Sequence, residues 1–215
     1  TVDQITPNSL RLSWPLAQDD VGIEHYRVTQ NGRDIALLDS MSLRTVVNDL
    51  TPWTDFTFEV TAIDAAGNTT EPLEVSLKTP DTIDPSWPDE AQLTISELEG
   101  RSLTVSWPTA VDDVSIMDYQ VSVDGLNVAT LDGELTQTKL EGLTPGMTIW
   151  VQVYARDPAG NQSSTLGVTV TLPDAGPPTW EDPRLNATAG ITDVMLTWTV
   201  AEDDIGVIGY RIYQD

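Results

Sequence analysis

The sequence of 215 residues contains no cysteine and only one histidine. Without cysteine there is no disulfide, no thiol nucleophile and no cysteine-ligated zinc site. The single histidine, His25, stands beside Tyr26 on an expected strand, where a solvent-facing side chain is its simplest role. A second histidine, a glycine-rich phosphate loop and a helix-borne zinc motif are all missing, which removes the usual catalytic constellations. We therefore predict that the chain is not an enzyme.

Positive charge is also scarce, because ten lysine and arginine residues stand against 34 aspartate and glutamate residues and leave a formal net charge of −24. Phosphate binding needs a basic stripe, so nucleic acid is excluded as a partner. The absence of any run of 18 apolar residues excludes direct membrane insertion. The acidic surface suits a secreted or high-salt setting, or one in which divalent cations neutralise part of the charge. The absence of disulfides favours a bacterial extracellular protein.

Internal repetition is what the chain has in abundance. Similar segments begin at Leu10 (LRLSWPLAQDDVGIEHYRV), Leu103 (LTVSWPTAVDDVSIMDYQV) and Val194 (VMLTWTVAEDDIGVIGYRI). The first two copies are 93 residues apart, a distance that Trp14 and Trp107 illustrate. A period of this length is a whole small domain rather than one turn of a solenoid. The sequence therefore predicts a tandem array.

Within a unit the apolar residues recur with a period of two, which is typical of half-buried strands. Leu103, Val105 and Trp107 alternate with polar residues, and the dipeptide Asp124-Gly125 provides a two-residue hairpin turn. Asn31-Gly32 occupies the matching place in the first copy. No stretch has the periodicity of a helix. Short strands separated by turns every eight to twelve residues predict an all-β fold of antiparallel sandwiches.

Four motifs carry a family resemblance: LTVSW from Leu103, the Tyr that opens the next strand, LEGLTPGMTIWVQVYA from Leu140 and DPAGNQS from Asp157. In this order and spacing they resemble fibronectin type III domains of the bacterial extracellular kind. The resemblance implies immunoglobulin-like β-sandwiches arranged as beads on a string. One departure is that Phe56 and Ile149 stand where the family usually has a tyrosine, whose hydroxyl ties down the loop between strands E and F.

The alignment of the copies divides the chain into three units joined by proline-rich acidic linkers, TPDTIDPSWP and LPDAGPPTWEDP. Residues 1–79 form a unit that lacks its first segment, and residues 80–172 form a complete unit. Residues 173–215 form the amino-terminal part of a third unit, from strand A to strand C, and stop where a hairpin turn is expected. A half sandwich leaves its inner face uncovered, so we expect the chain to be a segment of a longer protein.

The resemblance also implies that the amino terminus of a unit, its loop between strands B and C and its loop between strands F and G lie at one pole. Acidic residues and asparagines occur in all three segments, and Ca²⁺ takes six to eight oxygen ligands of this type. The candidate Ca²⁺ ligands are Asp19, Asp20, Asp64, Asn68, Asp81, Asp84, Asp112, Asp113, Asp157 and Asn161. The third copy contributes Asp174, Asp203 and Asp204. A bound ion at a linker would stiffen the array.

Turn formation is the alternative role for the same residues, because Asp and Asn side chains hydrogen-bond backbone amides in tight loops. The doublet Asp112-Asp113 and its two counterparts fit either role, and the sequence leaves both open. Paired carboxylates also serve glycoside hydrolysis. We reject catalysis because identical catalytic sites in every unit of an array would be unusual.

Four aromatic residues are candidates for contact with a partner. Trp150 and Tyr154 alternate out of phase with the core residues of their strand and therefore face the opposite side. A ligand platform there competes with contact to a neighbouring molecule and with an ordinary half-exposed ring. Trp53 lies in a loop at the far pole of the first unit and Trp87 opens the second, so the topology allows the two to pack across the junction.

Together these features predict a structural spacer or adhesion segment of a larger bacterial surface or secreted protein, with calcium stiffening its junctions as one option. The expected partners are other domains of the same long chain, and a protein or glycan at a cell surface or neighbouring copies in a fibre. The alternative is a glycan-binding or accessory module of a secreted polysaccharide-degrading enzyme.

Overall fold

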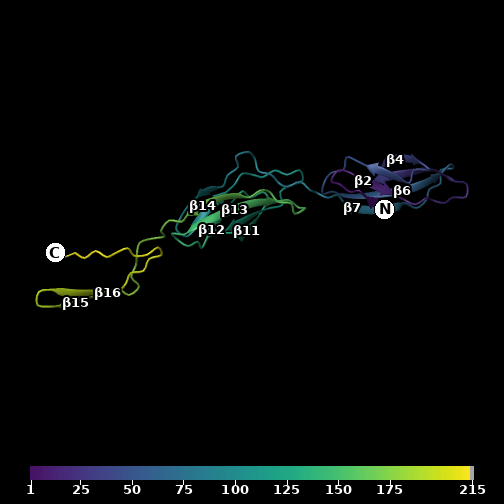
Figure 1. Ribbon diagram of the computed structural model, residues 1–215. Coiled ribbons are helices and arrows are strands. Elements are labelled where there is room, and N and C mark those ends of the chain that lie inside the picture. The colour runs from purple at the N-terminus through teal and green to yellow at the C-terminus, as the bar shows by residue number, and fades with distance from the viewer. Residues whose placement is uncertain (214–215) are drawn as a thin grey trace. The chain divides into compact units, whose positions relative to one another are not determined.

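The structure is a computed structural model that describes residues 1–213 (Figure 1). Every regular element in this range is a β-strand, and all the paired strands are antiparallel. The all-β fold class expected from the alternation of apolar and polar residues is therefore confirmed. No helix in the described residues has the length and apolar character needed to cross a bilayer.

The first sandwich contains seven strands in two sheets. Its strands are β1 (Val2–Asp3), β2 (Leu10–Ser13), β3 (Ile23–Gln30), β4 (Arg33–Asp39), β5 (Arg44–Val47), β6 (Asp55–Asp64) and β7 (Leu73–Lys78). One sheet has the order β1-β2-β5 and the other the order β4-β3-β6-β7. The side chains that alternate inward from the two sheets, among them Leu12, Val28 and Phe58, form one buried core.

The second sandwich repeats this arrangement strand for strand. Its strands are β8 (Thr94–Ser96), β9 (Ser102–Ser106), β10 (Asp118–Val123), β11 (Leu126–Asp132), β12 (Gln137–Glu141), β13 (Thr148–Arg156) and β14 (Leu166–Thr171). The sheet orders are β12-β9-β8 and β11-β10-β13-β14. Tyr119, Val121 and Val153 are fully buried in its core. The repeated period of 93 residues therefore corresponds to one complete sandwich.

The hairpin turns form where the sequence predicts them. Asn31 and Gly32 connect β3 to β4 with φ values of 50° and 76°, and Asp124 and Gly125 connect β10 to β11 with 50° and 82°. Positive φ at both central positions is what a tight hairpin of this twist requires. Asn and Asp tolerate the first position and glycine takes the second without a steric cost.

The loop between the fifth and sixth strands of each sandwich is closed without a tyrosine hydroxyl. In the first sandwich Thr79 is fully buried, and its hydroxyl donates to Thr51 O at 2.6 Å and accepts from Thr54 N at 3.0 Å. In the second sandwich Leu172 stands at the equivalent position and bonds only through its backbone, with its N–H donating to Met147 O at 2.9 Å. A residue after the last strand thus orders this loop in both copies.

The third copy forms a two-stranded hairpin of β15 (Leu185–Ala189) and β16 (Val194–Trp198). Residues 207–213, which include Tyr210 where strand C of this unit was expected to open, form no strand, and this corrects the expected strand C. In the complete sandwiches the equivalent strands β3 and β10 pair with two later strands, and this chain holds no third copy of either. The hairpin turn expected after this segment includes residues 214 and 215, which lie outside the described residues.

By its contacts the described chain divides into two compact units. The first comprises residues 1–85 with the loops 112–115 and 157–161, and the second comprises the remaining described residues. The linker 80–85 and the two loops that carry the predicted ligands therefore belong to one unit.

Candidate cation site

The first aspartate of each doublet forms the turn of its own loop. Asp112 Oδ2 accepts hydrogen bonds from Val114 N at 2.9 Å and Ser115 N at 3.0 Å. Asp19 and Asp203 make the same pair of bonds in the other two copies, at 2.7–2.9 Å. The turn therefore explains one aspartate of each doublet. The second aspartate takes no part in it.

A tyrosine hydroxyl holds the start of the same loop in all three copies. Tyr119 Oη accepts a hydrogen bond from Ala110 N at 2.9 Å, and Ala110 is only 3% exposed. The counterparts Tyr26 and Tyr210 accept from the equivalent backbone amides at 2.9 Å and 2.8 Å. Burial raises the pKa of Tyr119, so its hydroxyl stays protonated. The tyrosine that opens the third strand thus both fills the core and fixes the loop that carries the aspartates.

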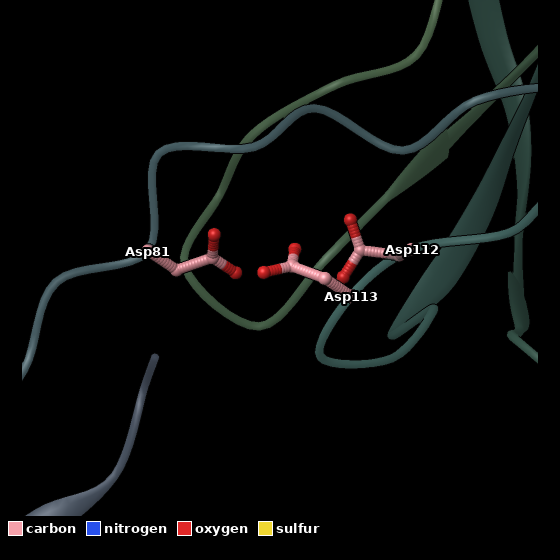
Figure 2. A group of neighbouring side chains, drawn as sticks. All are labelled: Asp81, Asp112 and Asp113. Carbon is pink, nitrogen blue, oxygen red and sulfur yellow. The ribbon is translucent and has the colours of Figure 1, made fainter. Parts of the chain in front are cut away.

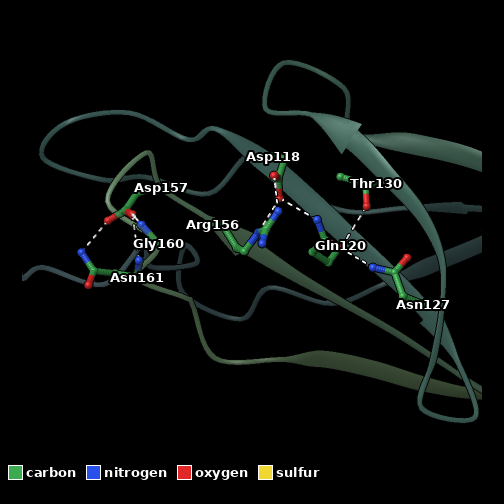
Figure 3. A network of polar contacts seen from close by, with 8 residues as sticks. All are labelled: Asp118, Gln120, Asn127, Thr130, Arg156, Asp157, Gly160 and Asn161. Carbon is green, nitrogen blue, oxygen red and sulfur yellow. Dashed lines mark hydrogen bonds and ion pairs between the residues drawn. The ribbon is translucent and has the colours of Figure 1, made fainter.

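The loop between the last two strands uses its carboxylate internally. Asp157 is fully buried; its Oδ1 accepts from Gly160 N at 2.7 Å and Asn161 N at 2.8 Å, and its Oδ2 accepts from Asn161 Nδ2 at 2.7 Å (Figure 3). Asp64 and Asn68 repeat this arrangement in the first sandwich, and the Asn68 side chain is the main cause of the lowered pKa of Asp64. Turn formation therefore accounts for these four predicted ligands.

Three of the predicted ligands converge. Asp81 of the linker and the doublet Asp112 and Asp113 each offer a carboxylate oxygen, and these oxygens all lie within 4.8 Å of one another. Figure 2 shows the Asp81 carboxylate pointing toward that of Asp113, with Asp112 beyond it. Asp81 comes from the segment after β7, whereas the doublet lies between β9 and β10. The fold thus brings together residues that are 31 positions apart in the chain.

The Asp81 side chain is buried and only half satisfied. The residue is 7% exposed; Oδ1 accepts from Ile83 N at 3.0 Å, while Oδ2 is buried without a hydrogen-bond partner. Asp112 Oδ1 is likewise buried and unpartnered. Burial is the largest cause of the raised pKa of Asp81, followed by repulsion from Asp113, Asp157 and Asp112. Within residues 1–213 no lysine, arginine or histidine pairs with these carboxylates.

A second group of three aspartates lies one unit later along the chain, and unlike the first group it is paired with an arginine. Asp174, Asp203 and Asp204 also offer oxygens within 4.8 Å of one another. Here Arg101 Nη2 lies 3.5 Å from Asp204 Oδ2, and Asp174 is exposed. Asn8 is the residue that corresponds to Arg101 in the first copy. The second group therefore contains its own positive charge, and the first does not.

The other predicted ligands lie outside both groups. Asp84 is exposed in the linker, and Asp19 and Asp20 are exposed in the first sandwich's loop. Within the described residues no third acidic side chain joins Asp19 and Asp20. The equivalent of Asp81 in that copy would precede residue 1.

Three of the four aromatic candidates have contacts in their own sandwich. Trp150 is 49% exposed on the outer face. Its ring packs so closely over Gly167 that a Cβ added to this glycine would lie 2.7 Å from Trp150 Nε1. Tyr154 is half-buried on the same face. Lys78 Nζ lies 4.6 Å from the centre of the Trp53 ring. Trp87 stacks on Tyr119 with ring centres 5.8 Å apart. A partner contact at any of these rings remains a prediction.

Sequence reasoning missed a polar network on the outer face of the second sandwich (Figure 3). Asp118, 8% exposed, accepts from Arg156 Nε at 2.9 Å and Nη2 at 2.6 Å, and from Gln120 Nε2 at 2.9 Å. Gln120 Oε1 in turn accepts from Asn127 and Thr130. The hydrogen bond from Arg156 is the main cause of the lowered pKa of Asp118. Asp118 and Arg156 are paired residues on the neighbouring strands β10 and β13. Their opposite charges were the only feature of the sequence that could have indicated this ion pair.

The first sandwich has no copy of this network. His25 and Ile63 stand at the positions of Asp118 and Arg156, and Arg27 stands at that of Gln120. Repetition along the sequence could therefore not have revealed the network.

The fibronectin type III domain model matches residues 1–77 and 86–171. The chain belongs to the fibronectin type III family. Its relatives include exoglucanase B of Cellulomonas fimi, 31% identical over 98% of this chain and 20% of that enzyme. Chitinase A1 of Niallia circulans is 32% identical over 62% of this chain and 19% of that enzyme. The fibronectin type III chain thus spans about a fifth of the length of these curated relatives.

Among solved structures, a two-domain fibronectin type III segment of chicken tenascin covers 80% of this chain and 96% of its own, with 23% identity and a TM-score of 0.42. Fibronectin type III domains are non-catalytic modules, and the matched relatives are enzymes only through other domains. The family assignment agrees with the resemblance that the sequence motifs carry.

Proposed function

We propose that this chain is a spacer of tandem fibronectin type III modules in a larger extracellular bacterial enzyme that degrades polysaccharides. The observation that carries the proposal is the pattern of coverage. Exoglucanase B matches almost the whole chain, yet the match takes up only a fifth of that enzyme. The shared part is therefore the modules, and the remaining four fifths hold whatever else such an enzyme contains.

The linkers support a spacing role. Pro80 and Pro85 flank the acidic stretch that joins β7 to the second sandwich, and Pro173, Pro177 and Pro178 follow β14. Proline fixes φ and favours extended backbone at the residue before it. Such linkers act as semi-rigid spacers and keep the flanking domains apart better than a glycine-serine chain of equal length.

An exchange of linkers tests the proposal. The 215-residue chain is placed between a cellulase catalytic domain and a cellulose-binding domain, and is compared with a flexible glycine-serine linker of 215 residues. A spacer is expected to give higher activity on insoluble cellulose and equal activity on a soluble substrate. Equal activity on both substrates would contradict a spacing function.

Glycan binding is the second candidate, and the exposed Trp150 ring favours it. Sugars stack on exposed aromatic faces, and Trp150 lies beside half-buried Tyr154 on the outer face of β13. The isolated chain is mixed with insoluble cellulose, chitin and xylan, and the bound fraction is measured for the unaltered protein and for Trp150→Ala. Binding that Trp150→Ala abolishes would support a glycan-binding module. If the chain bound none of the three polysaccharides, glycan binding would be rejected and the spacer function would remain. Trp180→Ala, at another half-exposed tryptophan, serves as the control.

A further inference from the structure

We propose that Asp81, Asp112 and Asp113 form a calcium site that joins the linker to the loop between β9 and β10. The proposal does not depend on the spacer function, because it concerns the linker and loop of the chain itself. It commits to the first acidic group alone.

The three carboxylates have the chemistry and spacing of a calcium site. Calcium–oxygen distances are about 2.3–2.6 Å, so oxygens on opposite sides of one ion are about 4.6–5.2 Å apart. The three oxygens lie within 4.8 Å of one another, which lets a single Ca²⁺ contact all of them. Around Mg²⁺ the corresponding separation is at most about 4.2 Å. Cysteine is absent and the only histidine is His25, so the group has no ligand that would favour zinc or copper.

The unpartnered oxygen of Asp81 is an independent sign of a ligand. Burying a carboxylate oxygen without a hydrogen bond or counter-charge is unfavourable. Only 7% of the Asp81 surface is exposed, so the residue is 93% buried, and its Oδ2 has no hydrogen-bond partner. Its side chain points toward Asp113 (Figure 2). Asp112 is held with one oxygen in the turn and the other, Oδ1, unpartnered. A divalent cation would satisfy both free oxygens.

Asp113 differs from its neighbour because the turn does not use its side chain. Asp112 caps Val114 and Ser115, so replacing it would damage the loop itself. Asp113 is exposed and needs no turn bond to hold its place, so its carboxylate is available to the ion. Asp113→Asn is therefore the variant that removes a ligand and leaves the loop intact.

The second acidic group shows what the first one lacks. Arg101 pairs with Asp204 at 3.5 Å and already neutralises part of that group. Asp174 is also exposed, so water can solvate its oxygens. We therefore expect one calcium ion per chain at the first group, although the sequence motif occurs three times.

Calorimetric titration of the 215-residue chain with CaCl₂ tests the site. We expect one ion per chain, with a dissociation constant of about 10⁻⁴–10⁻³ M, the range of extracellular calcium modules. Asp113→Asn and Asp81→Asn are each expected to weaken binding at least tenfold. Asp20→Asn, at the equivalent doublet position in the first sandwich, is the matched control and should bind like the unaltered chain.

In thermal unfolding, Asp113→Asn is expected to change the melting temperature in opposite directions without and with calcium. Without calcium, Asp113→Asn is expected to raise the melting temperature because it removes repulsion inside the group. With calcium, the unaltered chain should gain clearly more stability than Asp113→Asn gains. The absence of saturable calcium binding would overturn the site, as would calcium binding that survives both Asp113→Asn and Asp81→Asn. Magnesium binding as tight as calcium binding would overturn the assignment to calcium.

Discussion

At the scale of single residues, the two aspartates of a doublet differ in their hydrogen bonds, a difference that sequence alone could not show. Asp112 closes its turn through two backbone amides, as Asp19 and Asp203 do. Asp113 is free of that turn and faces Asp81. The loop backbone decides which aspartate closes the turn, because a carboxylate can cap only the amides that the turn points toward it. The turn therefore uses one oxygen of Asp112 and none of Asp113, which leaves Asp112 Oδ1 and the Asp113 carboxylate for the proposed ion.

Tyr119→Phe is expected to destabilise the second sandwich more than Tyr26→Phe destabilises the first. Each change removes one hydroxyl acceptor and leaves a backbone N–H without its partner, at Ala110 or Ala17. A buried unsatisfied donor costs about 1–3 kcal/mol. Ala110 is 3% exposed and cannot recruit water, whereas Ala17 is only half-buried.

Amide hydrogen exchange checks this directly. The Ala110 amide should lose protection in Tyr119→Phe, while amides in the middle of β13 should keep theirs unless the whole sandwich is weakened. Unchanged protection at Ala110 would contradict the role assigned to the hydroxyl.

At the scale of strands, the sequence predicts well what depends on neighbours along the chain. Alternation of apolar residues predicts β9 and β10, and Asp124-Gly125 predicts the hairpin between β10 and β11, because both signals are local. Residues 207–213 have the same alternation but form no strand, since a strand also needs a partner. Convergence of Asp81 with Asp112 and Asp113 was predictable only through the family topology. The pair of Asp118 and Arg156 depends on the register of β10 on β13 and was missed.

Asp118→Asn is expected to cost about 2 kcal/mol of folding stability at pH 7, because it removes a charged acceptor and leaves Arg156 unpaired. The pKa of Asp118 is lowered in the folded chain by Arg156, so its contribution is present above the unfolded pKa of about 3.9 and is lost as the pH falls through the folded pKa. The unaltered protein should therefore lose more stability than Asp118→Asn between about pH 5 and pH 3.

Urea unfolding at several pH values measures this difference. Asp55→Asn is the control, because Asp55 pairs with Lys78 at 3.5 Å with its side chain 80% exposed, and such a pair contributes about 0–1 kcal/mol. Parallel pH profiles for the unaltered protein and Asp118→Asn would show that the pair does not stabilise the sandwich.

At the scale of the whole chain, the large excess of negative charge dominates the electrostatics. The formal net charge of −24 disfavours the folded state through general repulsion, in addition to the local repulsion within the acidic group. The two kinds of repulsion respond differently to ions. Monovalent salt screens exposed charges over about 10 Å at 0.1 M and acts on the whole surface. A calcium ion at the proposed site of three carboxylates would act at one place only.

Raising NaCl from 0.01 M to 0.5 M in the presence of a chelator is therefore expected to increase the melting temperature of the unaltered chain and of Asp113→Asn alike. An increase of about 4 °C would correspond to roughly 1 kcal/mol for a domain of this size. Calcium at 5 mM, added at 0.5 M NaCl where screening is nearly complete, should then raise the melting temperature of the unaltered chain more than that of Asp113→Asn. Differential scanning calorimetry of both proteins under the four conditions separates the two effects. If salt abolished the calcium effect, calcium would be acting by screening and the carboxylates would hold no ion.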